Sequence, residues 1–412
     1  MEKYQEQIID LLNSSIHDTK PKLDYSKNVD WDNIIEESNA HSITGLLYPA
    51  LKRSGNNIDN EIIDRLKKIT FTSAIQQSKH IKDTAAILSL FNENNIPVIV
   101  LKGLVIRSYY PKPDLRTMCD SDIIIHKEDL TKVRELLLNQ GFREEDDAGH
   151  HIAFLKPGFN LEVHWTLANE TFRKGQECFQ EYIWDDARKI KVGGVDTLAL
   201  SLEDQALHFC AHMASHMAIS GFGVRQLADL VLLVEHEGKN INWNNFIEKA
   251  KKSGLYKFSL GMFKVCNYLF NMEIPKELND GNNDEEVIKL VVDDIFTGGV
   301  YGQRDLSFTF RAQVGYDIED DSTFSMIKRY IEIILPPPSK LSDRYGYAKK
   351  HKILLPVAWI HHIWVGLTTK EYDNESKKKF LTSTLSRAKS RNKVVVRALK
   401  VFNYIIYINN NI

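Results

Sequence analysis

The spacing of apolar side chains predicts helices over about the first 90 residues of the chain. Ile62, Leu66 and Ile69 recur at helical intervals, and a similar run extends from Ile87 to Phe91, as one apolar face of a helix requires. Turn residues at positions 94–97, with the sequence Asn-Asn-Ile-Pro, end this pattern. We therefore expect residues 1–95 to form an N-terminal helical region.

Between residues 96 and 198 the pattern alternates between strands and helices. Val98–Leu101 is mostly β-branched, as a buried strand requires, and Pro157-Gly158 is a turn signal suited to an antiparallel hairpin. The pattern predicts helices at Leu104–Tyr110 and Glu128–Asn139 and further strands at Cys119–Ile125, His151–Leu155 and Asn160–Trp165. This segment is expected to be a compact α/β unit with a mixed sheet.

Helical spacing returns after Leu200 and predicts a larger C-terminal helical region over residues 199–412. A polar loop (Asn279–Glu286), an acidic loop (Asp317–Asp321) and three prolines (336–338) interrupt it. The stretch from Lys377 to Lys400 carries many basic side chains among apolar ones. It fits either a solvated helix face or a contact with an anionic partner.

Composition narrows the function classes only in part. In 412 residues, 53 Lys and Arg nearly cancel 55 Asp and Glu, so no global charge excess indicates nucleic acid, a membrane or an acidic partner. The chain begins without a basic segment followed by an apolar one, and no uncharged apolar stretch reaches the ~18 residues that span a bilayer. We expect a cytoplasmic protein of two or three cooperating units.

The four cysteines argue against two kinds of site. Cys119, Cys178, Cys210 and Cys266 lie far apart, and none forms a Cys-x-x-Cys pair. This spacing disfavours both a disulfide framework and a thiolate zinc site. We expect four free, buried thiols.

Candidate chemistry is concentrated in the α/β unit. Asp120 and Asp122 are one residue apart on a predicted strand, which places both carboxylates on the same face. Two acids so close repel each other unless a divalent cation bridges them, and hard oxygen ligands suit Mg²⁺ shared with substrate phosphates. The pair alone is a weak signal for a metal site, because pairs of aspartates are common on protein surfaces. A third carboxylate, Glu162, alternates with core residues on another predicted strand, where His164 shares its face.

Two basic positions complete this constellation. Lys102-Gly103 follows the first strand and opens a helix, so a cation and backbone N–H groups are available to a phosphate. Arg116 lies four residues before Asp120 and could offer a bidentate fork to a triphosphate. Phosphate-binding glycine loops of the P-loop and Rossmann types are absent from the sequence.

Three linked motifs in this order resemble one known family. They are Leu101-Lys102-Gly103, then Arg116-x-x-x-Asp120-x-Asp122-Ile123, then Leu161-Glu162-Val163-His164-Trp165. The segment is similar to the uncharacterised bacterial nucleotidyltransferases, within the DNA polymerase beta-type nucleotidyltransferase superfamily. The resemblance implies an α+β fold in which a mixed-sheet catalytic core (residues 96–198) is flanked by the two helical regions.

The resemblance also implies a two-metal site. Asp120, Asp122 and Glu162 match the superfamily's acids that hold Mg²⁺ (or Mn²⁺), while an NTP, expected to be ATP, donates the nucleotide. Whether Glu162 binds metal or acts as a general base stays open. One departure is that Leu104 follows Gly103 where many members have serine, so Lys102 is expected to compensate for the missing hydroxyl.

Polar residues beyond the core are candidates for contacts with the acceptor or a phosphate. His208, His212 and His216 recur every four residues along one helix stripe, which fits a zinc site, a surface facing the acceptor cleft or a polar packing face. Arg225 either meets phosphate or pairs with Asp229 one turn away. We count His164, His212, His216 and Arg225 as these candidate contacts, and we interpret the adjacent pairs His150-His151 and His361-His362 as structural.

The sequence therefore predicts a metal-dependent nucleotidyltransferase. It would move a nucleoside monophosphate from an NTP to a hydroxyl or phosphate on a small molecule, peptide or protein. The alternative is a catalytically inert nucleotide-binding or protein-interaction module with the same fold. A nucleic-acid polymerase is disfavoured because a broad basic footprint is missing.

Overall fold

The computed structural model describes residues 1–412 except 28, 56–57, 146–149, 168–181, 220, 282–284, 301–327, 329–330, 339–340 and 369–412. The acidic loop Asp317–Asp321, Cys178 and the basic stretch Lys377–Lys400 lie outside the described residues.

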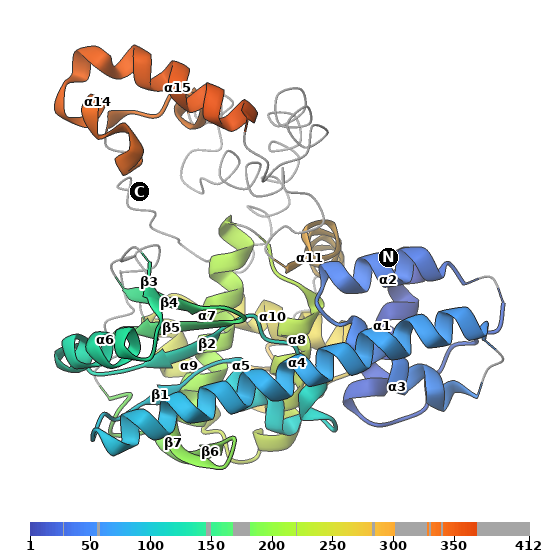
Figure 1. Ribbon diagram of the computed structural model, residues 1–412. Coiled ribbons are helices and arrows are strands. Elements are labelled where there is room, and N and C mark those ends of the chain that lie inside the picture. The colour runs from blue at the N-terminus through green and yellow to red at the C-terminus, as the bar shows by residue number, and fades with distance from the viewer. Residues whose placement is uncertain are drawn as a thin grey trace.

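A seven-stranded mixed sheet forms the centre of the α/β unit (Figure 1). Its order is β3-β4-β5-β2-β1-β7-β6; β1 pairs with β7 and β2 with β5 in parallel, and the other pairs are antiparallel. The strands are β1 (Ile99–Val100), β2 (Ser121–Ile124), β3 (Arg143–Glu144), β4 (His151–Lys156), β5 (Phe159–His164), β6 (Arg188–Val192) and β7 (Val195–Ala199). This architecture confirms the predicted mixed sheet, although the β6–β7 hairpin was not anticipated.

Two local predictions differ from the structure at their ends. The helix expected at Leu104–Tyr110 is a short α5 (Gly103–Ile106) followed by the 3₁₀ turn η1 (Arg107–Tyr109). Strand β2 begins at Ser121, so Asp120 lies just before the strand rather than on it. The helix α6 (Leu130–Asn139) and the β4–β5 hairpin lie where the sequence predicted them.

The helices that precede the sheet in the sequence and those that follow it pack into one common core. The N-terminal helices are α1 (Lys3–Ile16), α2 (Trp31–Ala40), α3 (Thr44–Ser54) and α4 (Asn60–Glu93); after the sheet come α7 (Leu202–Ile219), α8 (Val224–Glu237), α9 (Trp243–Lys252), α10 (Tyr256–Phe270) and α11 (Glu285–Gly298). A single apolar cluster joins residues from Ile8 through Leu66 with residues from Leu202 through Phe296. Two further helices, α14 (Gly346–Lys350) and α15 (Leu355–Thr368), follow later in the chain.

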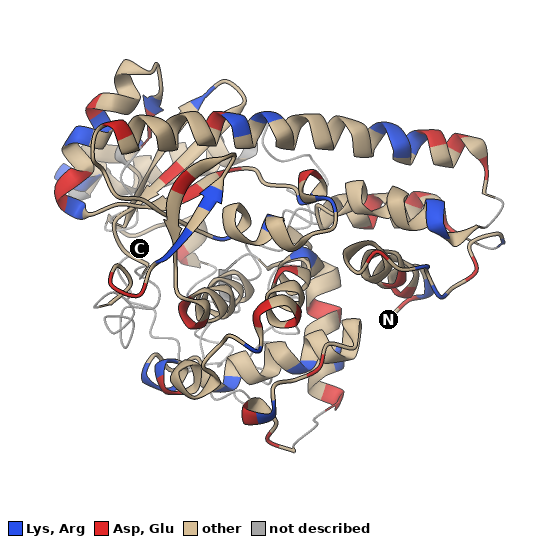
Figure 2. Ribbon diagram, turned by 90° about the horizontal axis from the view of Figure 1, so that it is seen from below, with Lys and Arg blue, Asp and Glu red and all other residues tan. Residues whose placement is uncertain are grey.

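The long helix α4 connects the helical part to the sheet (Figure 1). Its first half packs against α3, and its second half contributes Leu88 and Phe91 to the core beneath the strands. Figure 2 shows acidic and basic residues interspersed along these elements. None of the helices in the described ranges combines the length and the apolar character that a membrane span needs.

Candidate active site

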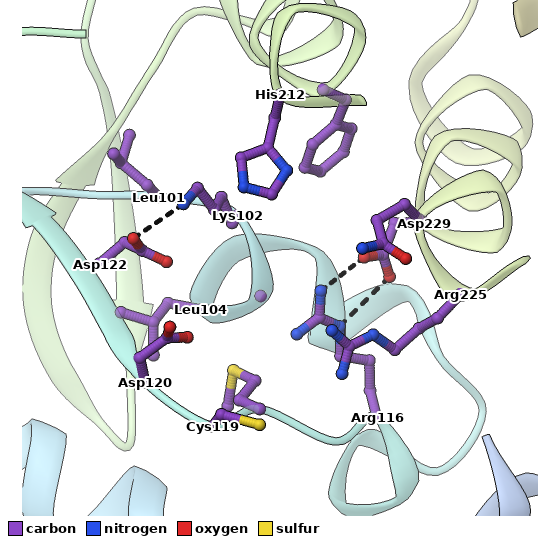
Figure 3. A pocket seen from close by; sticks show the side chains of 14 residues that line it. Leu101, Lys102, Leu104, Arg116, Cys119, Asp120, Asp122, His212, Arg225 and Asp229 are labelled. Atoms are coloured by element: carbon purple, nitrogen blue, oxygen red, sulfur yellow. Dashed lines mark hydrogen bonds and ion pairs between the residues drawn. The ribbon is translucent and has the colours of Figure 1, made fainter. Parts of the chain in front are cut away.

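A pocket lies where the α/β unit meets the C-terminal helices (Figure 3). Its walls come from the segment after β1, the segment that leads into β2, and the helices α7 and α8. The lining includes Lys102, Gly103, Arg116, Met118, Cys119, Asp120, Asp122, Phe209, His212, Arg225, Gln226 and Asp229. The structure therefore brings most of the candidate residues of the sequence to one place.

Cys119 is exposed, so the prediction that all cysteines are buried was wrong for it, while Cys210 and Cys266 are buried.

Asp122 is a deeply buried acid of the pocket. Its side chain is 6% exposed, and Lys102 Nζ donates a hydrogen bond to its Oδ1 over 2.8 Å. His164 Nε2 lies 3.3 Å from the same oxygen. Burial opposes ionisation of this carboxyl, but Lys102 and His164 outweigh it and hold the pKa of Asp122 well below its usual range. Asp122 is therefore a carboxylate at neutral pH.

Glu162 lies beside Asp122 because their strands are parallel neighbours. The Cα atoms of the two acids are register partners between β2 and β5. Glu162 is 29% exposed, and its Oε2 lies 3.4 Å from His164 Nε2. One ligand atom from each of Asp122, Glu162 and His164 lies within 4.8 Å of the other two, so these three could share a metal ion. The sequence had assigned His164 to acceptor or phosphate contacts, whereas the structure places it between two of the predicted metal ligands.

Asp120 belongs to the same pocket but experiences a different balance of forces. Burial, followed by the charge of Asp122, raises the pKa of Asp120 to about 6, and Lys102 only partly offsets this. The crowding of negative charge at this point is what a bound cation would relieve. Asp122 and Glu162 supply the carboxylate oxygens that a hard divalent cation prefers, and Asp120 adds negative charge beside them.

We predict that Asp120→Asn stabilises the metal-free protein at pH 8 but not at pH 4. The pKa of Asp120 in the folded protein is about 6, above its value in the unfolded chain. The folded state therefore holds this proton more tightly, and the free energy of unfolding falls as the pH rises from about 4 through about 6. The expected gain at pH 8 is on the order of 1–2 kcal/mol. Thermal unfolding in chelator at both pH values measures it, and an equal effect at both would contradict the argument.

Helix α4 fixes the segment that carries the acids. Gln77 makes two hydrogen bonds with the backbone of Met118: its Oε1 accepts from N–H over 2.9 Å, and its Nε2 donates to the carbonyl over 3.0 Å. One turn further on, Ser121 Oγ lies 2.9 Å from His80 Nε2 and 2.7 Å from Thr84 Oγ1. These residues of α4 were not predicted from the sequence to belong to the site. Their spacing of three and four positions on one helix face is the signal that could have found them.

Lys102 and Gly103 form a tight connection between β1 and α5. Lys102 adopts a φ of 48°, a left-handed conformation that non-glycine residues rarely adopt. A Cβ on Gly103 would lie 2.6 Å from Met118 Sδ and would also collide with Arg116 Nη1. Glycine therefore lets Arg116 and Met118 lie against the backbone here, and a side chain at this position would displace both of them.

Arg116 and Asp229 form a buried ion pair on one side of the pocket (Figure 3). Arg116 Nε donates to Asp229 Oδ1 over 3.2 Å, its Nη2 donates to Oδ2, and the Tyr110 hydroxyl adds a third bond of 2.8 Å to Oδ1. Arg225 Nη1 donates instead to the carbonyl and hydroxyl oxygens of Thr117, over 2.6 and 3.0 Å. Asp229, one of the two partners considered for Arg225, therefore pairs with Arg116 instead. The guanidinium of Arg116, which was expected to bind the triphosphate, is occupied by this carboxylate.

The histidine stripe lies on α7, and one of its members reaches the pocket. His212 lines it, and His212 Nε2 lies 3.0 Å from His216 Nε2. Burial, followed by the charge of Lys102, lowers the pKa values of His208 and His216 to about 3 and that of His212 well below its usual range. These rings are therefore neutral. Among the described residues, the stripe is not one of the groups close enough to share a metal ion, so the zinc alternative finds no support.

The comparisons with known proteins agree with this chemistry. A family model described as "Uncharacterised nucleotidyltransferase" matches residues 27–271. No curated protein matches the chain in sequence.

Three solved structures show weak likenesses. The antibiotic-resistance factor ANT(2'')-Ia is 13% identical with a TM-score of 0.31, over 40% of this chain and 87% of that one. An antigenic nucleotidyltransferase-like protein from Paracoccidioides brasiliensis is 15% identical with a TM-score of 0.30, over 50% and 99%. A tRNA-processing enzyme in its apo form is 11% identical with a TM-score of 0.26, over 76% and 97%. TM-scores this low carry no argument, so the assignment rests on the family model.

Proposed function

The chain belongs to the uncharacterised nucleotidyltransferase family, whose model matches more than half of it, and from this premise we propose the reaction and the roles of its residues. The protein transfers a nucleoside monophosphate from an NTP, with ATP as the expected donor, in the presence of Mg²⁺ or Mn²⁺. The acceptor is a hydroxyl or phosphate on a small molecule, peptide or protein.

The observation that carries this proposal is the proximity of three acids, two of which line the pocket. Asp122 and Glu162 are register partners on parallel strands, and Asp120 lines the pocket with Asp122. These three side chains would hold the divalent cations. When bound, such ions neutralise the triphosphate and stabilise the leaving pyrophosphate.

The protein's own groups then bind and orient the substrates. Lys102 and Arg225 line the pocket, Lys102 directly beside Asp122, and we assign both to the phosphates of the donor. The charge of Arg116 is compensated by Asp229, so we assign this arginine to positioning the pocket wall. Gly103 lets the backbone approach closely at this point. Glu162 is more exposed than Asp122 and is therefore the acid better placed to accept the acceptor's proton.

Binding of NTP is expected to require the divalent cation. Isothermal titration calorimetry with a non-hydrolysable NTP should show at least about tenfold weaker binding in chelator than in Mg²⁺, because uncompensated acids repel the triphosphate. Equal affinities under both conditions would overturn the metal-dependent assignment. Tight Mg²⁺-dependent binding without turnover across a screen of labelled acceptors would instead favour the inert nucleotide-binding module.

Replacement of His212 should separate the acceptor from the donor. His212 comes from α7 and lies on the wall opposite the strands (Figure 3), where ligand sites between two structural units commonly lie. We expect His212→Ala to lower transfer to the true acceptor by about 10- to 100-fold, as loss of one positioned polar contact does, with NTP affinity nearly unchanged.

The control for this prediction is His236→Ala, which removes a histidine that stacks on Tyr109 outside the pocket. Both constants are measured for each variant once an acceptor has been found with labelled NTP. Loss of NTP affinity with intact use of the acceptor would assign His212 to the donor side.

A further inference from the structure

His150, His151 and His164 form a cluster at the open end of the β4–β5 hairpin. His150 immediately precedes β4, and His151 begins it; the antiparallel register places the Cα of His151 opposite that of His164. Ring centroids are 4.4 Å apart for His150 and His151, 4.8 Å for His151 and His164, and 6.1 Å for His150 and His164. One ring nitrogen from each of the three lies within 4.8 Å of the other two.

The hydrogen bonds of His164 match those of a metal-bound histidine. Its Nε2 lies 3.3 Å from Asp122 Oδ1 and 3.4 Å from Glu162 Oε2. Histidines that bind metals commonly donate one ring N–H to a carboxylate while the other nitrogen coordinates the ion. With Nε2 bonded in this way, Nδ1 of His164 is the nitrogen left for a ligand.

A buried nitrogen of His151 points to the same conclusion. Its Nδ1 is shielded from solvent and has no hydrogen-bond partner among the residues that the structure describes. Buried polar atoms in folded proteins nearly always have a partner, so such an atom calls for an explanation. A cation bound by this cluster provides one, whereas an interpretation of His150-His151 as structural does not.

We propose that His150, His151 and His164 bind one divalent transition-metal cation of the Zn²⁺, Co²⁺ or Ni²⁺ class. Imidazole nitrogens suit these ions, whereas Mg²⁺ prefers oxygen ligands. Three protein ligands leave further coordination positions open. The site is distinct from the set of acids assigned to Mg²⁺, but Asp122 and Glu162 support it through His164.

Occupancy of this site would also fix the geometry of the acids. His164 contacts both Asp122 and Glu162, so an ion that holds its ring also restrains these two carboxylates. The inference rests on the geometry of the three histidines and does not require the proposed transfer reaction. Its failure would leave the Mg²⁺-dependent binding of NTP untouched.

Cobalt is the probe that tests the proposal. The untagged full-length protein is stripped with chelator, supplied with excess Mg²⁺ to fill the oxygen sites, and titrated with Co²⁺ while calorimetry and visible absorption are followed. We expect one equivalent to bind, with ligand-field bands typical of nitrogen ligation. His150→Asn and His151→Asn should each weaken cobalt binding by about 100-fold or more, because loss of a direct ligand should cost at least as much affinity as loss of a residue that only supports a ligand.

Matched variants make the outcome decisive. His351→Asn removes an exposed imidazole on the described part of the chain and should leave cobalt binding unchanged, while Glu162→Gln should weaken it by only about tenfold. Cobalt should also raise the unfolding temperature of the wild type but not that of the His150 and His151 variants, which themselves unfold cooperatively. Wild-type binding no tighter than that of these variants, or bands lost only on replacement of the acids, would overturn the proposal.

Discussion

Asp122→Asn is expected to lower the rate of nucleotidyl transfer by about 1000-fold or more, which corresponds to about 4 kcal/mol of transition-state stabilisation. The amide has nearly the shape of the carboxylate but lacks its charge, and Asp122 is the acid that Lys102 and His164 hold ionised. Loss of this charge removes a ligand of the proposed cation and releases Lys102 from its partner. Steady-state kinetics with saturating Mg²⁺, together with circular dichroism of the variant, measures the effect.

The matched control is Asp196→Asn on β7, because the Asp196 side chain is 82% exposed and its Lys191 partner is 67% exposed. This variant should keep full activity. Asp120→Asn should resemble Asp122→Asn in activity, since both acids line the pocket. Normal turnover in both pocket variants would refute the assignment of these acids to catalysis.

The sequence predicted the parts of the site that depend on local periodicity. The alternation in Leu161–Trp165 correctly placed Glu162 and His164 on one face of a strand, and their 3.4 Å separation follows from that alternation. The same reasoning could not say which strand is the neighbour of which. The parallel pairing of β2 with β5, which sets Asp122 beside Glu162, depends on contacts between segments that lie 40 residues apart in the sequence.

Long-range pairing also explains what the sequence did not predict about Arg116. An arginine four residues before the acid pair is a reasonable phosphate ligand. Its buried partner in the structure, Asp229, comes from α8, more than 100 residues later in the sequence. Likewise, the division into an N-terminal and a C-terminal helical region follows the periodicity, yet the helices of both regions share one apolar core. Spacing along a chain gives no information on which amphipathic faces pack together.

The Arg116–Asp229 pair therefore connects the α/β unit to the C-terminal helices, and its loss should destabilise the protein strongly. The two side chains are 7% and 3% exposed. Asp229→Asn leaves a buried guanidinium without a compensating charge, and breaking such a pair typically costs about 3–5 kcal/mol. We expect a decrease of this size in the free energy of unfolding, measured by urea denaturation followed through tryptophan fluorescence.

An exposed pair of the same chemistry is the control that isolates the effect of burial. Asp32 pairs with Arg65 over 2.9 Å, but these side chains are 89% and 48% exposed, so Asp32→Asn should cost less than about 1 kcal/mol. The double variant Arg116→Met/Asp229→Leu should be more stable than Asp229→Asn alone, because it leaves no buried charge uncompensated. If Asp229→Asn were as mild as Asp32→Asn, solvent would have to reach Arg116, and the ion pair would not be what holds α8 against the pocket.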